Sequence, residues 1–262
     1  MNGQTTIPSV VGPLGSSIQS IRLVTQALLS QKPWLHDPLV HEIPWRHDQE
    51  CEILDLTSPT SNSKLAIGIL RHDGLITPTP PVRRALDIVA TALQKLGHEV
   101  LDWDPPSHER LLEISAKTWL FDGGADVHAA FALSGEPMAS QIAMYHTLSR
   151  EYTASEVAAT NVELRALRTE YLAYWNSTAA KTTTGRPVDA VVAPVAPYPA
   201  ARKDRYKYYG YTIWVNVLDY TSVVLPVTKA DKSIDTIDGS YWPLNDVDKE
   251  TFESCELTIS GG

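Results

Sequence analysis

The sequence has little cysteine and no long apolar run. Its 262 residues include two cysteines, Cys51 and Cys255, whose wide separation suggests neither a disulfide framework nor a metal site. A reducing compartment, the cytoplasm, is therefore expected. No apolar stretch approaches the ~18 residues of a transmembrane helix, and the N-terminus lacks the basic and apolar pattern of a signal peptide. We therefore expect no membrane partner.

Positive charge is also scarce. The net charge is −9, with 22 basic and 31 acidic residues, which argues against nucleic acid as a partner. One short run, residues 202–209, alternates Arg and Lys with Tyr, a composition that can clamp single-stranded nucleic acid. Because the run is short and Asp204 interrupts it, a solvated loop is the preferred interpretation.

The remaining composition is that of a globular protein, 43% hydrophobic and 20% charged, without repeats or low-complexity blocks. The length suits one large domain or two small ones. Residues 64–103 predict a β-α-β unit, with a strand at Lys64–Leu70 and a returning strand at Val100–Trp103. The helix between them begins at Thr79-Pro80-Pro81 and is stopped by Gly97. Its apolar stripe is Val82, Ala85, Val89, Leu93 and Leu96.

Further helices are predicted from caps and periodicity, at about residues 16–30, 107–119, 125–133 and 153–180. The last of these opens with a capping box, Thr153 and Glu156. Residues 31–62 are expected to be irregular, and residues 246–262 show no core pattern.

The central stretch is Val188–Val227. Its two short β-branched runs, Val188–Ala193 and Thr221–Leu225, are typical of strands buried on both faces of a sheet. Between them, Trp214–Tyr220 carries Asn216 and Asp219 in apolar sequence. Because a buried polar side chain needs a hydrogen-bond partner, this segment is either a packed structural network or one wall of a pocket.

Two other groups have both a chemical and a structural interpretation. The pair Ser16-Ser17 could act as catalytic serines, but no glycine-rich turn or lysine accompanies it, which favours a helix cap. The histidines His36, His41 and His47 could bind zinc. Prolines among them disfavour a helix, so solvated loop histidines are preferred and no metal site or cofactor is expected.

Several spaced motifs, in one order, resemble the C-terminal portion of fungal amidases of the amidase signature family, the acetamidase-like branch. The similarity covers roughly residues 3–250 and is more specific than any single motif. The segments that carry it are Gln4-x-x-Ile7-Pro8-Ser9-Val10-Val11-Gly12-Pro13-Leu14, Lys32-Pro33-Trp34-x-x-Asp37-Pro38, Pro44-Trp45-Arg46, Asp122-Gly123-Gly124-Ala125, Ala193-Pro194-x-Ala196-Pro197, Gly210-Tyr211-Thr212-x-Trp214-x-Asn216-x-Leu218-Asp219-Tyr220, Val224-Leu225-Pro226-Val227-Thr228 and Trp242-Pro243-Leu244.

The resemblance implies hydrolysis of carboxylic amides to an acid and ammonia. The family uses a serine nucleophile, a second serine on a cis peptide bond and a lysine, all N-terminal to the matched region. No glycine-rich serine motif of that type occurs in this sequence, so no catalytic residue is assigned. We expect a truncated or inactive amidase that binds a small amide only when an N-terminal half completes it. The alternative is a non-catalytic interaction module that pairs with another chain.

The expected fold is α/β, a mixed, mostly parallel sheet flanked by helices, as a partial amidase signature fold. Residues 1–250 would form the partial domain and 251–262 a tail. Because the strands of the missing half are absent, one edge of the sheet would be open, so self-association through this edge is expected. The pocket candidates that the resemblance implies are Trp119, Asp122, Trp214 and Asn216. The structural alternative is that the tryptophans belong to the core and that Asp122 and Asn216 bind loop backbone.

Overall fold

The computed structural model describes residues 3–58, 63–201, 206–236, 239 and 241–260. It divides into two compact units, one made of residues 1–8 and 65–262 and the other of residues 9–64.

The smaller unit contains two α-helices, α1 (Ile18–Ser30) and α2 (His47–Leu56), with a short 3-10 turn at Pro33–Leu35. Residues 31–62 were expected to be irregular, but the structure has helix α2 in this segment. Glu50 on α2 accepts a 2.8 Å hydrogen bond from the Trp45 indole and lies 2.7 Å from Arg22 on α1. These contacts tie the two helices together, which sequence periodicity alone does not reveal.

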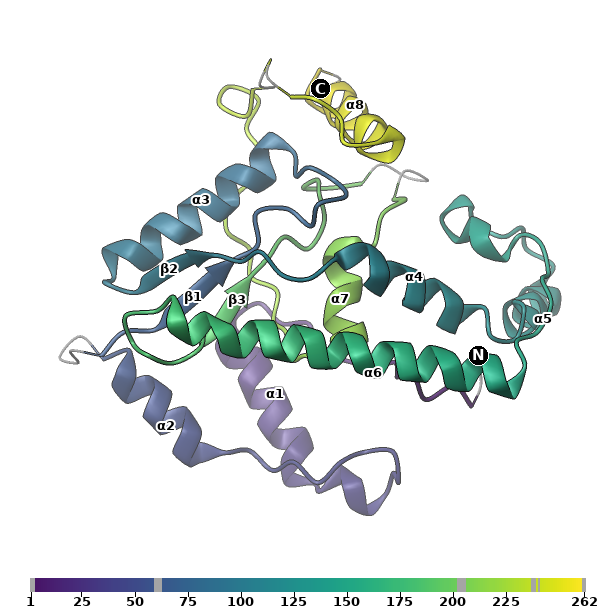
Figure 1. The fold of residues 1–262 in the computed structure, drawn as a ribbon, viewed down its shortest axis with the longest axis horizontal. Coiled ribbons are helices and arrows are strands. Elements are labelled where there is room, and N and C mark those ends of the chain that lie inside the picture. The colour runs from purple at the N-terminus through teal and green to yellow at the C-terminus, as the bar shows by residue number, and fades with distance from the viewer. Residues whose placement is uncertain (1–2, 59–62, 202–205, 237–238, 240, 261–262) are drawn as a thin grey trace. The chain divides into compact units, whose positions relative to one another are not determined.

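The larger unit contains a three-stranded parallel sheet in the order β2-β1-β3 (Figure 1). Its strands are β1 (Ala66–Ile69), β2 (Glu99–Asp102) and β3 (Ala190–Val192). Helix α3 (Pro80–Lys95) connects β1 to β2, which confirms the predicted β-α-β unit. At its end Gly97 has φ +83°, and the His98 amide donates to the Leu93 carbonyl at 3.0 Å. A left-handed glycine therefore terminates this helix as predicted.

Helices cover both faces of the sheet. On one face, Ile67 and Ile69 of β1 pack against Leu86 and Ala90 of α3. On the other, Ala66 and neighbouring residues pack against α4 (His108–Trp119), α6 (Ala154–Ser177) and α7 (Gly210–Leu218). Figure 1 shows the sheet between α3 and α6. The central strand β1 is thus buried on both faces. Burial on both faces was expected for Val188–Ala193 instead, where β3 is only partly buried.

The buried stripe of α3 is rotated relative to the prediction. Leu86 and Ala90 form its buried centre and Leu93 packs beside them, whereas Leu96 is 74% exposed. The prolines at the start of the helix are also buried. The contact with the sheet therefore follows one line of the helix surface, and the last turn extends beyond it.

The second predicted strand, Thr221–Leu225, is wrong. Residues 221–230 run without helix, turn or bend, and among the described residues they pair with no strand. Strand β3 is also an edge strand of the described sheet, whereas both of these segments were expected to be central. A β-branched sequence favours extended backbone, but a strand also requires a neighbour to accept its hydrogen bonds.

Two further helices are α5 (Ala125–Ser134) and α8 (Asp246–Ser260). Helix α8 crosses residue 250, the expected end of the domain. Its Asp248 is buried and accepts hydrogen bonds from the backbone of Thr77 at 2.8 Å and Leu244 at 2.9 Å. The beginning of α8 is thus fixed to the residues that follow β1.

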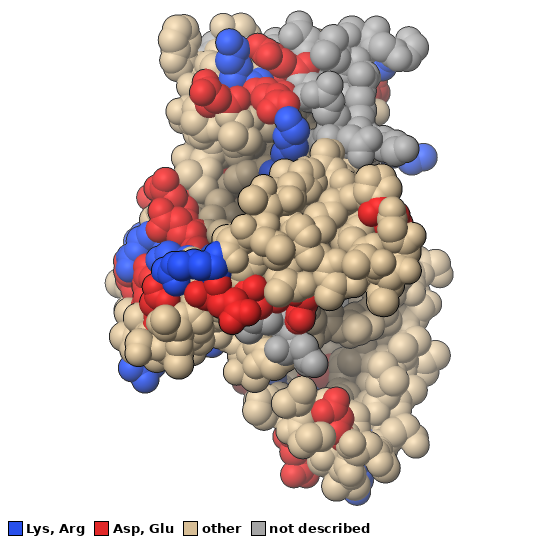
Figure 2. Space-filling view, turned by 90° about the vertical axis from the view of Figure 1, so that its right-hand side faces the viewer, with Lys and Arg blue, Asp and Glu red and all other residues tan. Residues whose placement is uncertain are grey.

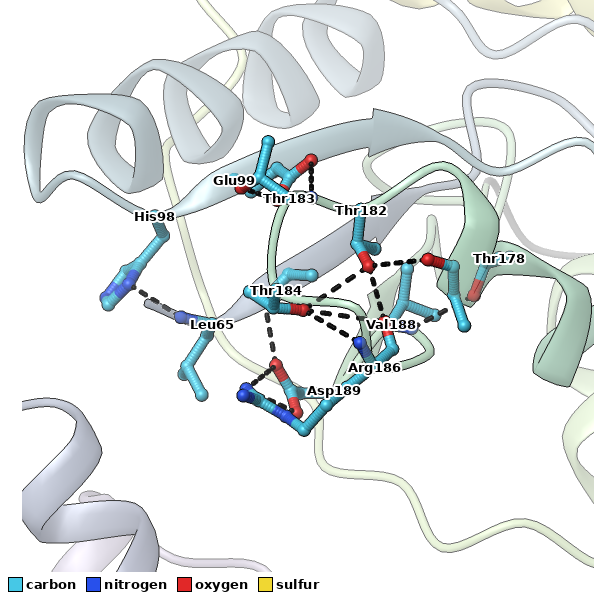
Figure 3. A network of polar contacts seen from close by, with 12 residues as sticks. Leu65, His98, Glu99, Thr178, Thr182, Thr183, Thr184, Arg186, Val188 and Asp189 are labelled. Atoms are coloured by element: carbon cyan, nitrogen blue, oxygen red, sulfur yellow. Dashed lines mark hydrogen bonds and ion pairs between the residues drawn. The ribbon is translucent and has the colours of Figure 1, made fainter. Parts of the chain in front are cut away.

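Hydrogen bonds to side chains hold the loop that leads into β3 (Figure 3). Glu99 of β2 accepts hydrogen bonds from the backbone and hydroxyl of Thr183, each at 2.8 Å. Asp189 accepts from the Ala66 amide at 2.8 Å. Val188 donates to the Thr178 hydroxyl at 3.0 Å. The bonds of Glu99 and Asp189 tie the chain before β3 to the starts of β2 and β1, and the bond to Thr178 ties it to the turn after α6.

The capping box of α6 forms as predicted. The Thr153 hydroxyl accepts from the Glu156 amide, and the Glu156 carboxylate accepts from the Thr153 amide. The guanidinium of Arg150 and the Thr153 amide lower the pKa of Glu156 to about 2, from its ordinary 4.5.

Glu156→Gln should make the protein less stable at neutral pH and hardly change it in strong acid. The folded state holds this carboxylate ionised, so its contribution is complete above about pH 4.5 and disappears as pH falls toward about 2. Melting temperatures of both proteins across this range measure the effect. Glu151→Gln removes the same charge at an exposed position without a cap and is the control. A constant difference across the range would contradict the capping role.

Candidate functional site

A cavity of about 710 Å³ lies beside β3, at the edge of the described sheet. Its walls come from four segments: the C-terminal part of α6, β3 with the residues after it, α7, and residues 220–224. Parallel α/β sheets commonly bind ligands beyond the carboxyl ends of their strands, and Ala193-Pro194-Val195, directly after β3, form part of this wall.

Helix α7 brings two of the predicted pocket residues, Trp214 and Asn216, to this cavity. Its apolar side faces the core, and Asp219, in the left-handed conformation at φ 61°, ends it. The Trp214 ring is buried against the rings of His108 and Tyr171, with centroids 5.7 Å and 6.1 Å away, and its N–H donates to the Tyr211 carbonyl at 3.1 Å.

Asn216 is exposed, so it needs no buried partner. Trp214–Tyr220 was interpreted either as a packed polar network or as one wall of a pocket. Asn216 is not part of a packed network, whereas both Trp214 and Asn216 lie in the wall of the cavity. Trp214 is at the same time part of the core, as the structural alternative expects.

The other two candidates, Trp119 and Asp122, do not line this cavity. Trp119, the last residue of α4, is partly buried and packs against the core. The Asp122 carboxylate accepts hydrogen bonds from the amides of Gly124 and Asp126, both at 3.0 Å. Although partial burial raises its pKa, these bonds bring the pKa of Asp122 below its ordinary value. The contacts fit the structural interpretation of a loop that caps α5.

The backbone at Gly123, between α4 and α5, requires glycine. Its φ is +67°, and a Cβ at this position would collide with the Ser149 carbonyl. The Gly123 carbonyl also accepts a 3.0 Å hydrogen bond from the Ser149 amide. The Asp122-Gly123-Gly124 motif thus joins α4 to α5 and fixes the chain before α6.

A smaller cleft of about 270 Å³ lies at the carboxyl ends of β1 and β2. Its wall includes Asp73 and the start of α4. Asp73 is fully engaged: it accepts from the Tyr208 hydroxyl at 2.5 Å and from the amides of Leu75 and Ile76. Burial lowers the pKa of His108, against the opposing charge of Asp73. Sequence analysis missed this cleft, although acidic residues directly after two neighbouring strands were a signal for it.

The other sequence candidates have structural roles or lie outside the described residues. Ser17 is the N-cap of α1 and accepts from the Ser20 amide at 3.1 Å, in agreement with the preferred interpretation. His47 begins α2 and lies 3.6 Å from Glu50. In the described ranges, no group of three His, Cys, Asp or Glu side chains is placed to hold a metal ion. Arg202, Lys203 and Arg205 lie outside these ranges.

On the face drawn in Figure 2, Lys and Arg lie beside Asp and Glu over part of the surface, while other acidic side chains stand apart from them. Ion pairs of this kind include Arg110–Glu170 at 2.9 Å and Lys117–Glu163 at 3.0 Å. None of the helices in the described part of the chain is both long and apolar enough to span a bilayer.

Comparison with known proteins identifies relatives over the whole chain. The chain is 37% identical to an acetamidase of Aspergillus oryzae, over all of this chain and 47% of that protein. It is 36% identical to an acetamidase of Emericella nidulans, over 95% of this chain and 44% of that protein. The chain therefore spans about half the length of these relatives.

The fold has a solved counterpart. A fatty acid amide hydrolase superposes with a TM-score of 0.79 and 22% sequence identity, over 98% of this chain and 44% of that one. The expected α/β class and amidase signature fold are thereby confirmed. The sequence model of the Amidase family matches residues 1–251. With relatives above 30% identity along its whole length, this chain belongs to the amidase family.

Proposed function

We propose that this chain forms the C-terminal part of an enzyme that hydrolyses small carboxylic amides to an acid and ammonia. The observation that carries the proposal is the similarity to two fungal acetamidases along the full length of the chain. The cavity beside β3 gives this similarity a physical counterpart, since it is open, largely apolar and lined by residues of the shared motifs.

In this proposal α7 supplies the wall that faces the substrate. Trp214 gives an apolar surface for the acyl group, held rigid by its aromatic neighbours. Asn216 carries a donor and an acceptor, so its side chain can pair with the amide of a substrate. Trp119 and Asp122, which lie elsewhere, support the fold and are no longer proposed for this wall.

The cavity wall does not supply a general base for a serine nucleophile. A serine hydroxyl is a weak nucleophile that needs an adjacent base, and Ser222 is the serine of this wall. The carboxylate there, Asp189, is bound to the Ala66 amide and to Arg186. Burial raises the pKa values of Tyr211 and Tyr220, so both stay protonated near neutrality. In this proposal the catalytic serines and lysine come from the part of the enzyme that this chain does not span.

The second candidate is a non-catalytic module that pairs with another chain. The exposed apolar side chains of residues 223–225 favour an interaction at this surface. The two candidates share the need for a partner and differ in whether the assembled protein turns over amide.

Ammonia release from acetamide tests the proposal. The chain alone should give only the background rate. Co-expression with the N-terminal part of the Aspergillus oryzae acetamidase that lies outside the match should give a complex that releases ammonia. A complex that forms without releasing ammonia from acetamide or longer amides would favour the interaction module. Release by the chain alone, unchanged by Ser16→Ala and Ser17→Ala, would show that the chain contains a nucleophile we did not assign.

A further inference from the structure

The small cleft at the carboxyl ends of β1 and β2 contains a buried ring nitrogen without a hydrogen-bond partner. His108, the first residue of α4, lines this cleft and is only 2% exposed. Its Nδ1 is buried and has no hydrogen-bond partner among the described residues. Buried polar atoms are normally paired, so an unpaired nitrogen beside a cleft marks a position for a ligand atom.

The neighbours of the His108 ring leave its Nδ1 edge toward the cleft. The ring stacks on Trp214 with centroids 5.7 Å apart, and its Nε2 lies 3.3 Å from the Tyr171 hydroxyl. Burial lowers the pKa of His108, and the charge of Asp73, which also lines the cleft, opposes this change. The ring thus lies within electrostatic reach of the cleft, and Nδ1 is the polar atom that it presents there.

Hydrogen bonding assigns the proton of this ring to Nδ1. The Tyr171 hydroxyl accepts from the Trp103 indole N–H at 3.1 Å. Burial raises the pKa of Tyr171, so the hydroxyl keeps its own proton, and His108 Nε2 is placed to accept it. Burial also keeps the His108 ring neutral, with a single proton. Because Nε2 is the acceptor, Nδ1 carries that proton and is an N–H donor.

The start of α4 also favours an acceptor atom in the cleft. Ser107, its N-cap residue, lines the cleft and makes no side-chain hydrogen bond to the first amides of this 12-residue helix. Such amides have no acceptor within the helix and carry the positive end of its dipole. The helix start and His108 Nδ1–H therefore favour the same kind of ligand atom.

The wall of the cleft is acidic. Asp104 and Glu109 line it, both are exposed, and within the described ranges neither carboxylate takes part in an ion pair. Asp73 adds a third carboxylate, whose oxygens accept from protein donors. The described lining residues include no Lys or Arg. This arrangement of charges attracts a cation and repels an anion.

We propose that this cleft binds a small organic ammonium ion that also carries a neutral hydrogen-bond acceptor, such as a hydroxyl or a carbonyl. His108 Nδ1–H donates to the acceptor, and the carboxylates of Asp104 and Glu109 hold the ammonium group. The volume of about 270 Å³ is just below that of common small-molecule sites, about 300–1,000 Å³, which favours a ligand of few atoms. The cleft shares no lining residue with the cavity beside β3, so the inference does not depend on the proposed hydrolysis.

A matched pair of ions tests the two parts of this site on the full chain. Ethanolammonium and ethylammonium carry the same charge and differ by one hydroxyl. Ethanolammonium should bind with a millimolar Kd, and ethylammonium roughly tenfold more weakly, in NMR titrations of the chain with 15N-labelled histidine. The His108 Nδ1 signal should move with ethanolammonium alone. Equal affinities would reduce the site to charge attraction, and no binding of either ion would leave the cleft to water, so both results overturn the proposal.

Glu109→Gln and Glu113→Gln form a matched pair of variants. Both residues are exposed on α4, but Glu113 lies one turn further along the helix and does not line the cleft. Glu109→Gln should weaken ethanolammonium binding severalfold, whereas Glu113→Gln should leave it unchanged. Equal weakening by both variants would mean that only the net charge of the chain matters, and it would overturn the site.

The tautomer of His108 can be measured without any substitution. The 15N shifts of the free chain at neutral pH should show a protonated Nδ1 and an unprotonated Nε2. This measurement is independent of any ligand. A ring protonated on Nε2 would lack the donor that faces the cleft, and the proposal would be rejected.

Discussion

Leu93→Asp should lower the free energy of unfolding by roughly 2–4 kcal/mol, because it brings a charge into an apolar contact without a partner. Leu93 lies on α3 and packs with Leu86 and Ala90 against the sheet. Its carbonyl accepts the hydrogen bond that ends the helix. The loss of apolar contact and the burial of a carboxylate act in the same direction, so the effect should be among the largest for single substitutions in this element.

Gln94→Asp is the matched control. Gln94 is exposed and lies one position further along the same turn, so the change should stay within about 0.5 kcal/mol, apart from the interaction with the helix dipole. That interaction is common to both variants and cancels in the comparison. Urea unfolding gives the two midpoints, with the slope as a check on two-state behaviour. Equal shifts of the midpoint would show that Leu93 does not face the sheet.

The sequence predicted the elements whose signals are local. Gly97 specifies a left-handed residue at a helix end, and Thr153 with Glu156 satisfies the first amides of a helix from within four residues. Neither signal depends on what the rest of the chain does. The α/β class followed from the same local patterns, with strands on either side of a helix.

The errors arose where distant residues decide the structure. Thr221–Leu225 has the composition of a buried strand, but a strand also needs a hydrogen-bonded neighbour, which the described residues do not provide. Helix α2 forms where prolines suggested irregular chain, since Arg22 and Trp45 hold Glu50 from outside the helix. For Trp214–Leu218 no helix or strand was predicted; it is helical, and its apolar side packs on α4 and α6.

The candidate site was predicted only in part, because contacts with distant residues also decide which motif residues line the cavity. Trp214 and Asn216 belong to one family motif, and both line the cavity although positions two apart on a helix point to different sides. Asp122 belongs to the same family motifs, but a carboxylate that caps a helix and one that faces a pocket are alike in sequence. Only its two backbone partners, Gly124 and Asp126, separate these roles.

Substitutions on α7 should separate the structural role of this helix from its proposed role in binding. Trp214→Ala should destabilise the chain by about 3–5 kcal/mol, because it leaves a cavity among the rings of His108, Tyr171 and Tyr220. Trp214→Phe keeps much of the ring contact and should be milder. Asn216→Ala should change the unfolding free energy by less than about 0.5 kcal/mol, since its side chain is exposed.

The role of Asn216 in binding is tested in the complex with the N-terminal part of the acetamidase. If Asn216 contacts the substrate amide, Asn216→Ala should lower kcat/KM for acetamide by roughly tenfold, the value of one well-placed hydrogen bond. The melting temperature of the complex should stay unchanged. Kinetics and thermal unfolding on the same preparation measure both quantities. A kcat/KM equal to that of the unaltered complex would remove Asn216 from the binding wall. A lower melting temperature of the complex would instead make Asn216 a structural residue of the interface. Its side chain is exposed in this chain, so its truncation can destabilise the complex only by removing contacts made there.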